Sequence, residues 1–151
     1  MKLITKLFYA IFDRATSITK IEKKISYTFI NKKYLEQAFT HKSINNSPKK
    51  NYERLEFLGD SVLDIIISRE LMREFPDGDE GLLTQRRAAL VQKPFLASIG
   101  QLLDLMEFLK IEENVNLEIN KIADKQLANI YEALIGAIYL DGGIIPCKKL
   151  I

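Results

Sequence analysis

The sequence is poor in the residue types that build disulfides, zinc sites and hydrolase triads. Its single cysteine, Cys147, excludes an internal disulfide, and no Cys/His cluster could hold zinc. The single histidine, His41, disfavours a Ser-His-Asp hydrolase but leaves histidine open as a base. For His41 itself we expect a loop or capping role. The lack of disulfides favours a reducing, cytoplasmic setting.

Long apolar runs and a strong charge excess are also missing. No run reaches the length of a membrane span, so no membrane partner is expected. In residues 1–20, Lys6 and Asp13 interrupt any signal-peptide core, while their acid-poor, amphipathic character leaves organelle targeting open. With a net charge of +2, any nucleic-acid footprint must be a local patch. The 151 residues, 47% of them apolar, indicate one globular domain.

Strand-like patterns, repeats and low-complexity tracts are absent, and helical periodicity dominates. Residues 3–12 carry one apolar stripe, which predicts that residues 1–19 form an amphipathic helical extension that docks onto the domain or onto a partner. Residues 20–151 are predicted to form an all-α helical bundle. Its helices are expected over residues 31–39, 52–75, 84–94, 95–109 and 123–140. Asn31 and Thr84 are expected to cap the first and the third of these, and the third contains Arg86 and is broken at Pro94. Residues 111–122 are predicted as a loop.

The stretch "ERLEFLGDSVL" opens the predicted 52–75 helix and carries acids inside an apolar pattern. At 100° per residue, the four acids fall within an arc of about 80°, opposite the apolar side. Like charges at this spacing destabilise a helix unless something positive lies over them. The alternative is a solvated acidic face near a helix N-terminus, where the helix dipole favours acids. The acids are Glu53, Glu56, Asp60 and Asp64.

A second motif, "LANIYEALIGAIYLDGG", places Asn129 and Glu132 at i and i+3, beside Gly136 and two alanines. Small residues around two oxygen-bearing side chains permit close approach by another helix or a ligand. The alternative is a packing seam with two incidental polar groups. Together the two motifs offer carboxylate and amide oxygens, which suit Mg²⁺ or Mn²⁺. Such ions can drive phosphodiester hydrolysis without a histidine base.

These residues resemble a known family. "NYERLEFLGDSVLD" is similar to the signature of ribonuclease III, the double-stranded-RNA endonucleases. "THKS" before it and "DEGLLTQRRAALV" and "ANIYEALIGAIYLDGG" after it follow in the same order. The resemblance covers about residues 20 to 145.

The resemblance implies a metal-dependent endoribonuclease with the helical-bundle fold of that family. It implies Mg²⁺ with Mn²⁺ as a substitute, no organic cofactor, and a homodimer that cuts both strands of duplex RNA to 5′-phosphate and 3′-hydroxyl ends. Duplex RNA is read mainly by shape. The metal-binding acids would be Glu56, Asp60 and Glu132, with Glu53 and Glu80 as further acids. Phe57 would pack into the partner.

The chain departs from the family pattern in two ways. Asn129 stands where the family usually has Asp, which keeps a ligating oxygen but loses a charge. The chain also ends at Ile151, where typical bacterial members continue into a double-stranded-RNA-binding domain. RNA affinity would then rest on local, salt-sensitive cations, each of which is otherwise a solvated surface charge. These are Lys42, Lys49, Lys50, Arg86 and Arg87.

Two other functions stay open at this stage. One is a non-catalytic RNA-binding or ribosome-associated domain that keeps the fold and the dimer. The other is a regulatory partner that pairs with a full-length paralogue.

Overall fold

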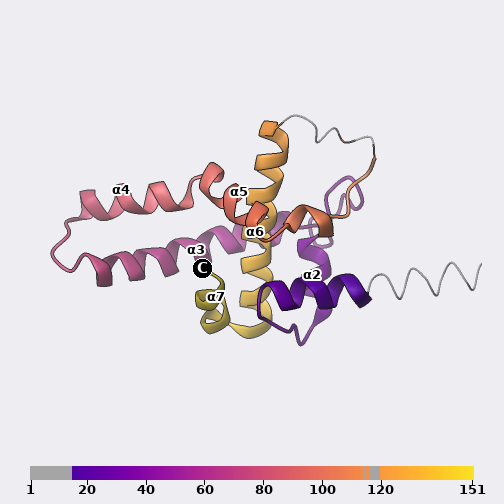
Figure 1. The fold of residues 1–151 in the computed structure, drawn as a ribbon, viewed down its shortest axis with the longest axis horizontal. Coiled ribbons are helices and arrows are strands. Elements are labelled where there is room, and N and C mark those ends of the chain that lie inside the picture. The colour runs from indigo at the N-terminus through magenta and orange to yellow at the C-terminus, as the bar shows by residue number, and fades with distance from the viewer. Residues whose placement is uncertain (1–14, 114, 116–119) are drawn as a thin grey trace, which may run out of the picture.

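The computed structural model describes residues 15–113, 115 and 120–151, and this part is helical (Figure 1). No strand occurs within it, only an isolated bridge between Thr40 and Lys110. The predicted all-α fold is therefore confirmed. A helix over residues 15–24 precedes the named elements, which are α2 (Lys32–Ala38), α3 (Glu53–Glu74), α4 (Glu80–Val91), α5 (Lys93–Leu102), the 3₁₀ helix η1 (Leu105–Phe108), α6 (Asn120–Gly142) and α7 (Ile144–Leu150).

At the N-terminus, the stripe predicted for residues 3–12 lies outside the described residues. The helix over residues 15–24 crosses the predicted boundary at residue 20, and its Ile21 is buried in the core. Within the described ranges, no helix is long and apolar enough to cross a membrane.

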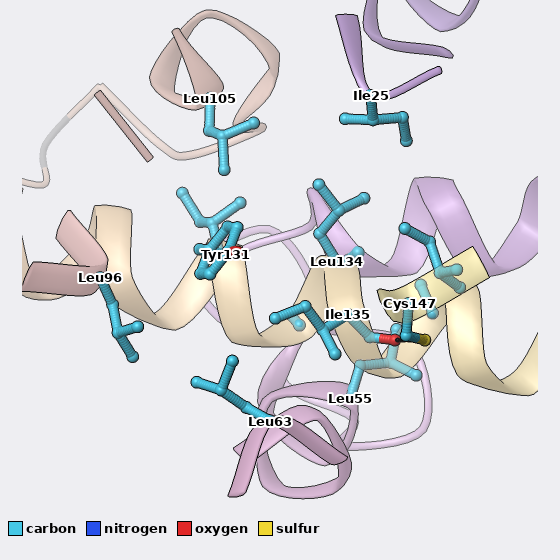
Figure 2. Close-up of a cluster of buried hydrophobic side chains, with 14 of the residues drawn as sticks. Ile25, Leu55, Leu63, Leu96, Leu105, Tyr131, Leu134, Ile135 and Cys147 are labelled. Atoms are coloured by element: carbon cyan, nitrogen blue, oxygen red, sulfur yellow. Dashed lines mark hydrogen bonds between the residues drawn. The ribbon is translucent and has the colours of Figure 1, made fainter. Parts of the chain in front are cut away.

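Helix α6 is the centre of the core. Every residue from 126 to 138 is buried, and α6 contacts α2, α3, α5, α7 and η1. Around its Tyr131 and Leu134, side chains from other elements close in, including Leu63, Leu96 and Leu105 (Figure 2). A helix that is apolar on nearly all sides must be enclosed in this way. Helix α3 is not enclosed to the same extent, since its Ile65 is 59% exposed.

Two glycines let α3 and α6 cross with their backbones in contact. A Cβ on Gly59 would overlap the Glu132 carbonyl oxygen, and a Cβ on Gly136 would overlap the Leu55 carbonyl oxygen. Only hydrogen fits at both positions, so the pair sets the separation of the two helices. The small-residue packing seam considered for α6 is therefore present, and it brings the acid-bearing part of α3 against Glu132.

The second half of α3 and the antiparallel α4 project from the core as a helical arm, on the left of Figure 1. No residue of α4 is fully buried. The arm is held by contacts between its two helices. The Arg87 guanidinium donates to Ser68 Oγ at 3.0 Å, and the Arg86 guanidinium lies 5.3 Å from the centre of the Phe75 ring.

The predicted Asn31 cap is confirmed, and other predicted helix ends are corrected. Asn31 caps α2, since its Oδ1 accepts from Lys33 N at 3.2 Å. Thr84 does not cap α4. The helix begins at Glu80, and Asp79 Oδ1 accepts from Leu82 N at 2.8 Å. The stretch 95–109 is not one helix, because Asp104 adopts a left-handed backbone with φ 51° between α5 and η1.

Helix α6 also begins earlier than predicted, at Asn120, and ends at Gly142. Residues 120–122 of the predicted loop 111–122 are therefore helical, and residues 111–113 are not; residues 114 and 116–119 lie outside the described part.

Replacing Gly59 by alanine tests the α3–α6 crossing. We expect the free energy of unfolding to fall by at least about 2 kcal/mol, because the added methyl group forces two backbones apart. Gly81→Ala in α4 is the matched control, since its Cβ meets only Asp79 Oδ1, at 3.5 Å. It should raise stability by about 0.5 kcal/mol. Urea denaturation measures both variants, and a Gly59→Ala protein as stable as the wild type would contradict the crossing.

Candidate metal and phosphodiester site

The crossing brings together four of the predicted site residues. Glu56 and Asp60 flank Gly59 on α3, one turn of helix apart, and the backbone of Glu132 lies against Gly59 from α6. Asn129 precedes Glu132 by one turn, on the same side of α6. Glu132 and Asn129 are 2% and 5% exposed, Glu56 is half-buried and Asp60 is exposed. The site therefore has a buried wall on α6 and a more open wall on α3.

Lys93, at the start of α5, is a site residue that the sequence did not reveal. Its Nζ donates to Glu132 Oε2 at 2.6 Å and to Asn129 Oδ1 at 3.0 Å, and lies 3.6 Å from Glu56 Oε1. The ammonium thus joins both walls. No local pattern in "VQKPF" marks this lysine, because its partners lie 36 or more residues away.

Burial and charge work against each other in this site. Burial raises the pKa of Glu132, and the charges of Glu56 and Asp60 raise it further, whereas Lys93 opposes the rise. Burial likewise raises the pKa of Glu56, again against Lys93. The site thus carries concentrated negative charge that one ammonium only partly offsets, and this favours a further cation.

The donor atoms fit a hard divalent cation. Two carboxylates and an amide oxygen converge on one point, and they already hold a positive charge there, the Lys93 ammonium. Oxygen ligands of this kind are those preferred by Mg²⁺ and Mn²⁺. Across the described ranges, no group of three or more His, Cys, Asp or Glu side chains could by itself hold a metal ion. Asparagine is not among these residue types, and the third oxygen that could ligate a metal ion at this site is the amide oxygen of Asn129.

Neighbouring polar side chains fix the start of α3. Asn51 is fully buried, its Oδ1 accepts from Glu53 N at 3.0 Å and its Nδ2 donates to Asn45 O at 3.0 Å. Tyr52 donates its hydroxyl to Gln126 Oε1 at 2.8 Å, a bond between α3's first turn and α6. Both contacts orient the first turn of α3, from which Glu56 projects.

The remaining predicted acids lie outside this convergence. Glu53 Oε1 lies 3.6 Å from Lys42 Nζ, and this ion pair lies at the rim of the site. Glu80 lies at the tip of the arm and accepts from the Thr84 hydroxyl at 2.9 Å. Counted along α3 from Glu56 to Phe75, the tip is about 28 Å away. Within one chain Glu80 therefore does not reach the site, and its catalytic role stays a prediction.

The predicted RNA-binding cations form two separate groups. Lys42, Lys49 and Lys50 are exposed in the loop before α3, next to the acidic rim. Arg86 and Arg87 lie on the arm. Phe57 is 78% exposed and, with Leu58, Arg54 and Leu140 among others, borders a hollow of about 610 Å³.

The fold and the facing helices have known counterparts. A family model described as Ribonuclease-III-like matches residues 31–151. The chain therefore belongs to the ribonuclease-III-like family, as its motifs indicated.

Individual relatives agree with this assignment. Ribonuclease 3 of Flavobacterium psychrophilum is 37% identical over 157 residues, across 100% of this chain and 62% of that protein. Ribonuclease 3 of Leptospira interrogans is 39% identical over 142 residues, across 92% and 58%. The chain spans about three fifths of the length of these curated relatives.

The fold is also that of a solved structure. The nuclease domain of ribonuclease III from Campylobacter jejuni superposes with a TM-score of 0.81 at 38% identity, covering 88% of this chain and 92% of that one. Flexibility in a region involved in dimer formation is described for that domain.

His41 has the structural role expected for it. It is 5% exposed, and its Nδ1 accepts from Ser43 N at 3.1 Å. Its own backbone N donates to Lys110 O at 2.9 Å, which ties the loop to the segment after η1. Burial lowers the pKa of His41 below 6.5, and the charge of Lys42 lowers it further. Protonation of Nδ1 would also break the bond from Ser43.

This arrangement predicts a pH dependence of stability. Above pH 6.5 the ring is neutral in both the folded and the unfolded chain. As the pH falls below 6.5, the unfolded chain binds the proton first, so stability declines until the pH reaches the lowered folded pKa. The free-energy difference between the wild type and His41→Asn should shrink by at most about 1.4 kcal/mol per pH unit in this window. Urea denaturation in EDTA from pH 5 to 8 measures it, and a constant difference would refute the prediction.

Proposed function

We propose that residues 20–151 are the catalytic domain of an endoribonuclease that hydrolyses double-stranded RNA with Mg²⁺, or Mn²⁺ in its place, to 5′-phosphate and 3′-hydroxyl ends. The observation that carries the proposal is the convergence of Glu56, Asn129 and Glu132 on one cation across the glycine crossing. Relatives named Ribonuclease 3 support the substrate class. A cytoplasmic location stays a prediction from the single cysteine.

Each wall of the site has its own part in this function. Glu132 and Asn129 are buried on α6, so their oxygens are held in place and shielded from water. Glu56 and the exposed Asp60 face them from α3 and keep the site open toward solvent and substrate. A divalent cation bound by these residues supplies water activation and charge stabilisation at the phosphate.

Positive side chains around the acids would receive the RNA backbone. Lys42, Lys49 and Lys50 adjoin the acidic rim, and Arg86 and Arg87 extend along the arm. Contacts from such groups to phosphates position a duplex without reading its sequence, and they weaken as salt rises.

A homodimer through α3 is part of the proposal. Phe57, Ile65 and Met72 are 78%, 59% and 63% exposed. By the helical period they fall within an arc of about 80°, next to the acidic arc. An exposed apolar row on a helix is typical of a contact surface.

Cleavage of a long RNA duplex in Mg²⁺ tests the site. Glu132→Gln keeps the shape but removes the buried charge, and we expect it to slow cleavage about a hundredfold or more. Asp64→Asn is the matched control, because it also replaces a carboxylate by an amide, but on α3 one turn beyond Asp60, and it should leave the rate unchanged. Cleavage at the wild-type rate by Glu132→Gln would contradict the assignment.

A binding-only domain is the second candidate, and Asn129 favours it because this residue supplies an amide where the family pattern implies a carboxylate. In the same assay, a wild type that binds the duplex without cutting it, together with cleavage by Asn129→Asp, would establish this alternative.

The dimer has a separate test. Phe57→Ala should shift the protein from dimer to monomer in analytical ultracentrifugation at micromolar concentration, because it removes the largest exposed side chain of the row. Leu102→Ala, at an 82% exposed position on α5, should leave the dimer intact. A wild type that sediments as a monomer would exclude this interface.

A further inference from the structure

Lys93 reaches the site from outside both acidic helices. It stands at the first position of α5, directly after the arm, and its side chain is 48% exposed. The Glu132 side chain that it contacts is 3% exposed. A buried carboxylate needs a partner of opposite charge, and Lys93 is that partner. The lysine is therefore part of the site and not a solvated surface charge.

The Lys93 ammonium uses oxygens that a metal ion would also need. It donates hydrogen bonds to Asn129 Oδ1 and Glu132 Oε2, the two oxygens of the buried wall that could ligate a metal ion. A divalent cation ligated by both of these oxygens would lie within a few ångströms of Nζ, where two positive charges repel strongly in a partly buried site. On this wall, an ion and the ammonium exclude each other.

Asn129 makes this arrangement stable. Its neutral amide oxygen accepts one hydrogen bond from Lys93 and adds no charge of its own. A carboxylate there would add a negative charge that could help hold a further divalent cation, whereas the amide adds none. The missing carboxylate at position 129 and the added ammonium at position 93 therefore both reduce the attraction of this wall for a divalent cation.

The charges of the site support a single ion. The carboxylates of Glu56, Asp60 and Glu132 set against the Lys93 ammonium leave two negative charges, which one divalent cation neutralises. The charge of Glu53 is offset separately by Lys42 at 3.6 Å.

We propose that Lys93, held by Asn129 and Glu132, is a built-in cation that replaces one metal ion, so that this site binds one divalent cation and not two. The single ion is held on the α3 side of the site by Glu56, with Glu132 shared between the ion and Lys93. This inference rests on the proposed metal-dependent function.

Mn²⁺ binding to the whole chain tests it, by equilibrium dialysis with free Mn²⁺ read by electron paramagnetic resonance. The wild type should bind one Mn²⁺ per chain. Lys93→Met should bind its first ion at least tenfold more tightly, and Lys93→Met combined with Asn129→Asp should bind two. Lys93→Arg keeps the charge and should stay at one ion. Lys148→Met is the matched control, since Lys148 lies 3.9 Å from Glu70 of α3, outside the site, and it should bind as the wild type does.

Thermal unfolding gives a readout that does not depend on activity. In EDTA, Lys93→Met should melt below the wild type, because Glu132 loses its partner. Mn²⁺ should then raise the melting temperature of Lys93→Met more than that of the wild type. A lysine that acts only in packing would lower both melting temperatures without this difference.

The outcomes separate the inference from the proposed function. Two ions bound per wild-type chain, or unchanged binding in Lys93→Met and in the double variant, would overturn the role of Lys93 and leave a metal-dependent nuclease intact. No Mn²⁺ bound by any of these proteins at millimolar concentration would overturn both.

Discussion

The contact of the α3 and α6 backbones at Gly59 and Gly136 is the constraint on which the rest of this structure depends. Because neither position has room for a Cβ, the two backbones lie directly against each other at the crossing. Helix α6 is enclosed by the other elements, so the crossing also fixes where the core sits. The same contact sets the acids of α3 against Glu132. Packing and chemistry therefore share one structural cause.

Bringing the two helices together buries the Glu132 carboxylate beside other acids, which costs electrostatic free energy. A residue of a third helix offsets this cost. Glu132 is buried beside Glu56 and Asp60, and burial raises the pKa of Glu132. Without a partner, such a charge would destabilise the fold. Lys93 from α5 supplies the partner and partly offsets the negative charge of the site. Stability and cation binding compete for the same oxygens, as is common at functional sites.

Local patterns predicted the elements well and their junctions less well. The predicted helix 52–75 agrees with α3 almost to the residue, and Asn31 marked the start of α2. Thr84 failed as a cap because Asp79 lies nearer the true start of α4. The break at Asp104 was missed because the apolar spacing continues through it, while tertiary packing bends the chain there.

The sequence by itself determined the acidic arc of α3, the i and i+3 pair on α6 and the family to which the chain belongs. The arc and the pair each lie within about three turns of one helix, and helical geometry converts their spacing into a shared face. The family follows from short motifs whose order along the chain can be read directly. Only the tertiary structure decided that α6 is the central helix, that Glu80 lies far from the site within one chain, and that Lys93 joins it. Those facts depend on contacts between distant segments, which no local periodicity encodes.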